Sequence, residues 1–129
     1  KGDITETDRV AWRLNRLTPY VSSPLLYDGT LYFVRHNQNI LSRYEAVSCK
    51  PRGEPLRIQG ISEIFGSPLG AAGRIYIAGR DGAVVVLRHD AANAVLAVNH
   101  LDDIFTASPV AVDRDLYLRG EKFLYCLGE

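Results

Sequence analysis

Two short clusters of carboxylates are the groups in this sequence with the spacing best suited to chemistry. Asp102 and Asp103 are adjacent, and Asp113 and Asp115 enclose Arg114. Calcium sites use several oxygen ligands at such short spacing. The triplet, however, places an arginine between its acids and stands where the chain turns between two apolar runs. We therefore interpret it as a turn and predict no metal site there.

The histidines and cysteines do not form a recognisable metal site either. His36, His89 and His100 make no close ligand pair, and neither cysteine lies near a histidine in the sequence. Cys126 sits in an apolar stretch, where a free cysteine behaves as a small hydrophobe, and Cys49 sits in a turn. Two alternatives stay open: a Cys49–Cys126 disulfide, and a metal site assembled from distant parts of the chain. Two cysteines do not determine the redox compartment.

Catalytic signatures are absent from the sequence. Nucleophilic catalysis needs a nucleophile, a base and a group that orients the base, and no local motif supplies this set. Gly66, Gly70 and Gly73 are followed by neither the helix nor the lysine of a phosphate-binding loop. We predict no catalytic, cofactor-binding or metal-binding residue, no cofactor, and hence a protein that is not an enzyme.

An internal repeat organises the chain. Two landmarks recur with the same spacings, 44 and then 41 residues: a Ser-Pro pair and an apolar-Tyr-apolar triplet. The pairs are Ser23-Pro24, Ser67-Pro68 and Ser108-Pro109, and the triplets are centred on Tyr32, Tyr76 and Tyr117. A period of about 40 to 45 residues is typical of a four-stranded β-propeller blade. We interpret the serines as small packing residues and the tyrosines as packing between blades.

Each repeat has the pattern of short strands separated by turns. Asp28-Gly29 and Arg80-Asp81-Gly82 are strong hairpin signals, because glycine accepts a positive φ without a clash. The run Val84 to Leu87 favours strand over helix. The predicted strands are 23–27, 31–35, 40–46 and 56–59 in the first repeat, 67–71, 74–78, 83–89 and 95–98 in the second, and 108–112, 116–119 and 123–127 in the third.

The predicted organisation is a single all-β propeller segment with strand order d-abcd-abcd-abc. Residues 1–9 form a polar lead, 22–60 and 66–100 are complete blades, and 107–128 is a blade without its fourth strand. Residues 10–14, which contain the single tryptophan, Trp12, precede a Ser-Pro pair as the other fourth strands do. We therefore predict an outer strand at 10–14. A leading d strand and a trailing abc set are complementary, because an unpaired blade edge exposes backbone donors and acceptors.

With these motifs the chain resembles the pyrroloquinoline-quinone-like (PQQ-like) repeat propellers over about residues 10 to 128. The pattern Ser-Pro-x-x-x-x-Gly-x-x-Tyr, a Gly or Asn turn, and a strand ending near Tyr44-Glu45-Ala46 matches the blade of that family. Trp12 fits the family's tryptophan position in the outer strand, although the second and third repeats lack this tryptophan. Tyr44 to Gly53 is a degenerate version of the family's Asp-Ala and Thr-Gly connection.

The resemblance implies a fold and several functions. The family includes quinone-dependent alcohol dehydrogenases and non-catalytic relatives, among them a propeller lipoprotein of bacterial outer-membrane protein assembly. The dehydrogenases carry adjacent cysteines over the quinone and Asp, Glu and Asn ligands for calcium, and no residue here matches that site. The resemblance therefore implies the non-catalytic branch: a bacterial binding or scaffolding propeller that mediates protein interaction. The alternatives are a fragment of a quinone-dependent dehydrogenase and a carbohydrate-binding propeller. Family members tend to be exported, which implies the periplasm or the cell surface.

Charge and hydropathy limit the kinds of partner that the chain can have. Fifteen basic and fifteen acidic residues cancel, whereas nucleic-acid binding needs a basic surplus or patch. The densest basic region, from Lys50 to Arg57, is interrupted by Glu54 and is interpreted as a solvated turn. No apolar run approaches the roughly 20 residues that cross a bilayer. We predict neither a nucleic-acid partner nor a membrane span.

Three blades are too few to close a propeller, which typically has four to eight. One hypothesis is self-association, in which two copies form a six-bladed homo-oligomeric ring and residues 10–14 of one complete the last blade of the other. The other is a longer natural protein whose remaining blades lie elsewhere, as the absence of any methionine suggests. Size-exclusion or light-scattering mass separates the two.

Overall fold

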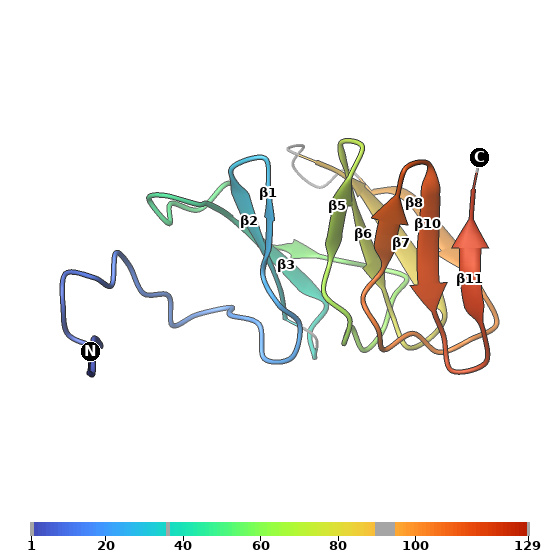
Figure 1. Ribbon diagram of the computed structural model, residues 1–129, viewed down its shortest axis with the longest axis horizontal. Helices are drawn as coiled ribbons and strands as arrows, with labels where there is room; N and C mark the ends of the chain where they lie inside the picture. Colours follow the sequence, from blue (N-terminus) through green and yellow to red (C-terminus); the bar gives the residue numbers. More distant parts are fainter. Residues whose placement is uncertain (1, 36, 90–94, 129) are drawn as a thin grey trace.

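A computed structural model of the chain describes residues 2–35, 37–89 and 95–128. These residues form eleven β-strands and no helix. No described segment is therefore a helix long and apolar enough to span a membrane. Each strand pairs antiparallel with the next strand along the chain in its sheet, so three separate sheets follow one another from the N-terminal to the C-terminal side (Figure 1).

The three sheets are the three blades that the repeat predicts. The first blade contains β1 (Leu25–Tyr27), β2 (Thr30–Arg35), β3 (Ile40–Glu45) and β4 (Leu56–Arg57). The second contains β5 (Leu69–Ala71), β6 (Arg74–Ala78), β7 (Ala83–Arg88) and β8 (Val95–His100). The third contains β9 (Val110–Val112), β10 (Asp115–Arg119) and β11 (Leu124–Leu127).

Two-residue turns join the first two strands of every blade. Asp28 and Gly29 have φ values of 46° and 70°, and Ala72 and Gly73 have values of 48° and 69°. Positive φ at both central positions gives the turn twist that matches paired antiparallel strands. Asp113 also has a positive φ, 53°, in the turn between β9 and β10. The predicted hairpins at Asp28-Gly29 and before β10 are thus confirmed.

The core lies between neighbouring sheets. Side chains alternate across each sheet, so one face of a blade packs against its predecessor and the other against its successor. The joint between the first and second blades buries Tyr32, Val34, Ile75, Ile77 and Val85 among others. The joint between the second and third is smaller and is built from Ala78, Val84, Phe105 and Leu118.

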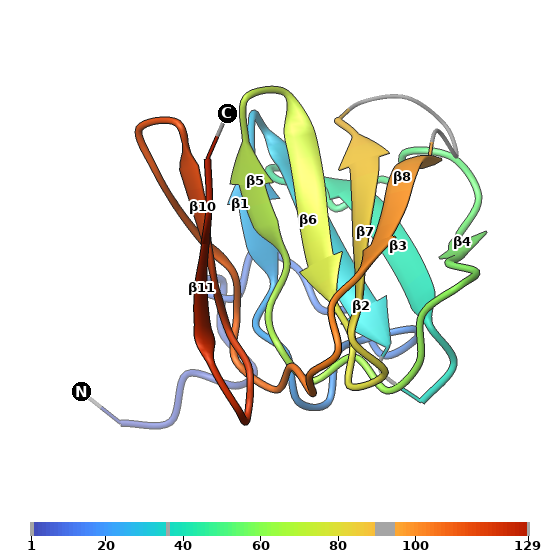
Figure 2. The ribbon, with the colours of Figure 1, turned by 90° about the vertical axis from the view of Figure 1, so that its right-hand side faces the viewer.

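The blades are arranged side by side with equivalent strands adjacent. β1 lies beside β5, and β5 lies beside β9, so the first strands of the blades form one side of the assembly. β4 and β8, the outer strands, lie on the opposite side (Figure 2). This arrangement of antiparallel sheets is that of consecutive propeller blades, and the predicted all-β propeller segment is confirmed.

Several predicted boundaries differ from the structure. Residues 10–14 form no strand in the part of the chain that the structure describes. Figure 1 gives the reason: these residues lie at one end of the molecule and β11, the strand they would extend, lies at the other. β4 ends at Arg57, two residues earlier than predicted, and β8 continues to His100. The turn predicted at 90–93 and the residue His36 both lie outside the described residues.

Candidate interaction surfaces

The joint between the first two blades is fastened by a chain of polar contacts around His89. The Tyr32 hydroxyl lies 2.7 Å from Nδ1 of His89, and Nε2 of His89 lies 3.4 Å from Oδ2 of Asp28. An acid, an imidazole and a hydroxyl in this order resemble a catalytic triad. The tyrosine side chain is only 1% exposed, however, so its hydroxyl faces the joint and not a cleft. The arrangement therefore connects β2 and the turn after β1 with the end of β7.

Tyr27 fills the same joint near its rim. Its ring lies edge-on to His89, with centroids 4.9 Å apart, and covers the backbone of Gly70. A Cβ at Gly70 would lie 2.5 Å from the Tyr27 ring, so the close packing of β1 on β5 requires glycine there. The amide of Gly73 donates a hydrogen bond of 2.9 Å to the Tyr27 hydroxyl. A large side chain on one blade thus occupies the space that a glycine leaves on the next.

The three repeated serines form a ladder of hydrogen bonds between blades. The amide of Ser23 donates to Oγ of Ser67, and the amide of Ser67 donates to Oγ of Ser108, both at 2.8 Å. The ladder has a direction: each donor lies in one blade and its acceptor hydroxyl lies in the following blade. Within the described residues, the amide of Ser108 and the hydroxyl of Ser23 have no such partner, so each end of the ladder is open. The sequence predicted these serines as small packing residues and gave no sign of the hydrogen bonds between blades.

Asp103 anchors the third blade to the segment that enters it. Its carboxylate, only 6% exposed, accepts hydrogen bonds from the amides of Ile104, Lys122 and Phe123 and from the hydroxyl of Tyr125. Desolvation by burial acts to raise the pKa of Asp103, but these hydrogen bonds together outweigh it and lower the pKa to about 2. The carboxylate is thus a structural group that orders the turn between β10 and β11. In the sequence, the adjacent pair Asp102 and Asp103 gave no sign that Asp103 is buried and accepts these hydrogen bonds.

The outward face of the third blade exposes several apolar side chains. We call it the trailing face; by strand register and alternation it carries Val110, Val112, Tyr117, Leu124 and Cys126, together with the charged Asp115 and Arg119 at its edges. Val110, Val112 and Leu124 are 51%, 52% and 68% exposed. The equivalents of the first two in the first blade are Leu25 and Tyr27, which pack against the joint core. The trailing face therefore presents to solvent the surface that the other blades bury.

The chain before the first blade repeats the chain before the second. Residues 10–22, the leading segment, align without a gap on residues 54–66 at the 44-residue spacing. This alignment places Trp12, Leu14, Leu17 and Tyr20 on Leu56, Ile58, Ile61 and Ile64. Ile58, Ile61 and Ile64 are 2%, 5% and 0% exposed in the first joint, whereas Tyr20 is 86% exposed. The leading segment thus has the side chains of a joint without a preceding blade to cover them.

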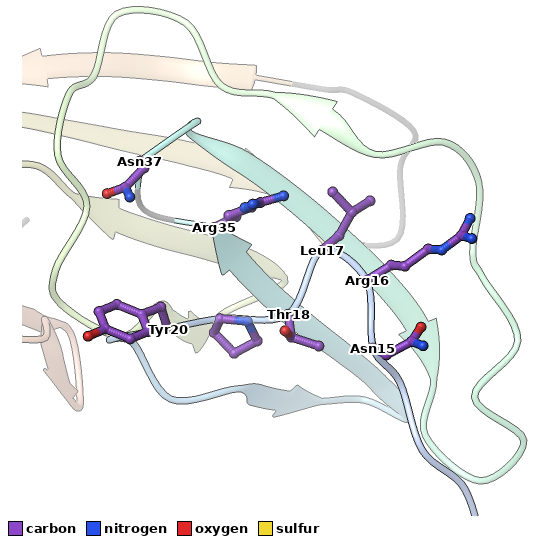
Figure 3. A pocket seen from close by; sticks show the side chains of 8 residues that line it. Asn15, Arg16, Leu17, Thr18, Tyr20, Arg35 and Asn37 are labelled. Carbon is purple, nitrogen blue, oxygen red and sulfur yellow. The ribbon is translucent and has the colours of Figure 1, made fainter.

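A cavity of about 740 Å³ lies where that joint would be. Residues 15–20 pass across β2 and β3, and the cavity lies between this stretch and the end of β2 (Figure 3). Arg35 and Asn37 line it on the blade side, and Leu17 and Tyr20 line it on the segment side. At the position of Arg35 the second and third blades have Gly79 and Gly120, whose missing Cβ atoms admit Ile61 and Asp103.

The other residues considered in the sequence lie apart from one another. Cys49 and Cys126 are free thiols, the first in a turn and the second on β11. Within the described residues, no three of the histidine, cysteine, aspartate and glutamate side chains are grouped to hold a metal ion. Tyr32 is buried in the first joint, as its predicted packing role requires, whereas Tyr117 is half-buried on the trailing face.

Comparison with known proteins supports the fold. No protein-family description matches the sequence, and no curated protein matches it. Among solved structures, the chain is similar to BamB from Moraxella catarrhalis with a TM-score of 0.71 and 16% sequence identity. The match covers 92% of this chain and 36% of that chain, so this chain spans little more than a third of its length. The likeness establishes a β-propeller fold, with the three blades corresponding to part of a larger propeller.

Proposed function

We propose that the chain is a non-catalytic binding or scaffolding β-propeller segment of the PQQ-like repeat type that mediates protein interaction. The observation that carries the proposal is the trailing face, on which Val110, Val112 and Leu124 are each more than half exposed. Contiguous exposed apolar surface marks interaction sites in soluble proteins. No strand of the described chain pairs with the outer edge of β11, and such an edge of backbone donors and acceptors favours pairing with another polypeptide.

The proposed working surface has two parts. The first part is the exposed blade faces and the β11 edge, which pack against another blade, either a further blade or one from another copy. The second part is the loops at the ends of the strands, which contact other proteins. Loops on a rigid scaffold are where propellers and other repeat folds place recognition. The balanced charge favours a protein over a nucleic acid as the partner.

A retention experiment tests the proposal. The chain and a Val112→Glu/Leu124→Lys double variant are immobilised, and the proteins that each retains from a cell extract are compared by mass spectrometry. We expect a defined set of proteins on the original chain and its loss on the variant, because the changed residues are exposed and bury little core. Equal retention by both would contradict the role of the trailing face.

A second assay tests the non-catalytic part. The purified chain is supplied with pyrroloquinoline quinone, calcium, and a panel of alcohols and sugars, and dye reduction is followed. We expect no turnover above the protein-free rate. Oxidation that requires the chain would overturn the proposal and favour a piece of a quinone-dependent dehydrogenase, while saturable binding to a glycan array would favour a carbohydrate-binding propeller.

A further inference from the structure

We infer that the trailing face docks head to tail on the leading segment and first blade of a second copy of this chain, with the amide of Ser108 donating to the hydroxyl of Ser23 in the other copy. This inference rests on the proposed function as an interaction propeller and names one partner for it. A second joint of the same kind would join the other two faces and give a ring of two copies. Four observations carry the inference.

The first observation is that the chain already makes this kind of joint twice. In each, the face of one blade that carries its repeated tyrosine packs against the opposite face of the following blade. Among the described residues, the two blade faces that no other blade covers are the tyrosine face of the third blade and the opposite face of the first. On the latter, residues 15–20 pass across β2 and β3 (Figure 3), and Phe33 and Tyr44 are buried. These two faces are of the same two kinds that each internal joint brings together. A head-to-tail contact would therefore pack the tyrosine face of the third blade on the opposite face of the first blade of another copy.

The second observation is the leading segment. In the first joint, Ile58, Ile61 and Ile64 run between two blades and are almost completely buried. Their equivalents Leu14 and Leu17 are only half-buried, and Tyr20 is exposed. A blade that packs against the first blade from this side would cover these three side chains in the manner of the first joint. It would also occupy the space of the cavity in Figure 3.

The third observation is the open serine ladder. Its direction is fixed, because the amide of the earlier blade always donates to the hydroxyl of the later one. Among the described residues, the amide that lacks a ladder partner is that of Ser108 on the third blade, and the hydroxyl that lacks one is that of Ser23 on the first. Only a head-to-tail contact matches a donor with an acceptor; two trailing faces would bring two donors together.

The fourth observation is the edge of β11. The outer strands β4 and β8 extend the first two blades, whereas no described strand pairs with β11 on that side. Val10, Trp12 and Leu14 are half-buried and alternate with the exposed Ala11 and Arg13, which is the period of a strand. Residues 10–14 of a second copy would therefore pair with β11 as β8 pairs with β7, and Trp12 would enter the joint at the position of Leu56.

The first experiment measures association and its dependence on Ser23. Light-scattering mass of the purified 129-residue chain is followed to roughly 100 µM, a range that detects weak dimers. We expect twice the monomer mass of 14.3 kDa. Ser23→Ala is expected to raise the dissociation constant roughly tenfold without lowering the melting temperature of the monomer, because the Ser23 hydroxyl has no partner within the described chain.

Ser67→Ala is the matched control. The Ser67 hydroxyl accepts a hydrogen bond within the chain, so its loss should lower the melting temperature whether or not copies associate. A chain that stays monomeric throughout the concentration range would overturn the inference. A dimer that Ser23→Ala leaves unchanged in affinity would also overturn it, because the ladder would not cross the joint.

The second experiment tests the head-to-tail direction by complementation. One variant disables the leading side with Leu14→Glu/Leu17→Glu, and the other disables the trailing side with Val112→Glu/Leu124→Glu. Each variant alone should be monomeric, whereas an equimolar mixture should form a heterodimer through its one intact joint. Restored pairing also shows that both variants fold.

Two further readouts separate the possible failures. Trp12 is the single tryptophan, so its emission should shift to shorter wavelength when the joint forms and stay unchanged in the Leu14→Glu/Leu17→Glu variant alone. Failure of the mixture to pair while the original chain dimerises would contradict the head-to-tail direction. A strictly monomeric chain that still retains other proteins through Val112 and Leu124 would refute this inference and leave the proposed function standing.

Discussion

At the scale of single residues, the carboxylate of Asp103 couples the stability of the third blade to pH. Its pKa of about 2 in the folded chain lies below the usual value of 3.8. The ionised carboxylate is therefore more stable in the folded chain than in the unfolded chain, and ionisation stabilises the fold. This contribution is complete above about pH 4 and is lost as the pH falls toward 2. The pKa of Glu45 is also lowered to about 2, first by a hydrogen bond with the Ser48 side chain and then by hydrogen bonds from the amides of Ser48 and Val47, and it acts in the same direction.

We expect Asp103→Asn to lower the melting temperature at pH 7, because an amide cannot accept the four hydrogen bonds that the carboxylate accepts. The variant should also lose less stability than the original chain between pH 5 and pH 2. Thermal melts across this pH range, followed by circular dichroism, measure both effects. The control is Asp102→Asn, whose fully exposed side chain pairs with the exposed Lys122 and should change little. Parallel pH profiles for the original chain and Asp103→Asn would refute the assignment.

A second prediction at this scale concerns Tyr32. Replacing it with phenylalanine removes the hydroxyl that contacts His89 in a buried joint, and we expect a loss of about 1 to 2 kcal/mol in the free energy of unfolding. The matched control is Tyr76→Phe at the equivalent position of the second blade, where the tyrosine is half-buried. Denaturant titration compares the two. Equal losses would show that the polar contact with His89 adds no stability.

At the scale of elements, glycine sets how closely neighbouring blades approach. A Cβ on Gly66 would lie 2.6 Å from the carbonyl oxygen of Ala107, in the backbone that enters the third blade. Because a backbone atom cannot rotate away, Gly66→Ala should push the segments apart and cost about 1 to 3 kcal/mol. Gly29→Ala is the comparison: its Cβ would meet nothing within 4 Å, so only the strain of its φ of 70° remains. Denaturant titration should rank Gly66→Ala as the more destabilising of the two.

The strands themselves were largely predictable from the sequence. The period of two, the Asp-Gly turn and the 44- and 41-residue spacings place β1 to β3, β5 to β7 and β9 to β11 within a few residues. Local signals suffice here because a hairpin depends on its own turn and on its own alternation. The outer strands were less predictable: β4 is two residues long, and residues 10–14 form no strand, because outer strands depend on which edge is available for pairing.

At the scale of the whole molecule, the two joints differ in strength. The first contains eleven buried residues and the second only four, so the third blade gains less from its neighbour. In repeat architectures stability is a sum over units and their joints, and the weaker joint opens first. We expect the amides of β9, β10 and β11 to exchange with deuterium faster than those of β2, β3, β6 and β7. Uniform protection over all three blades would show that the chain opens as one unit. At concentrations where copies associate, protection of β11 should rise.

The sequence alone determined the number of blades, the order of the strands within each blade and the absence of a recognisable catalytic motif, because repeats, turns and alternation are local properties of the chain. It also identified the repeated serines and tyrosines, but not what they contact. Only the tertiary structure showed that Ser23, Ser67 and Ser108 form a directional ladder, that Asp103 is a buried acceptor of four hydrogen bonds, and that Tyr20 is exposed where Ile64 is buried. These features depend on contacts between blades, and which surfaces meet is decided by packing in space and not by any residue's neighbours in sequence.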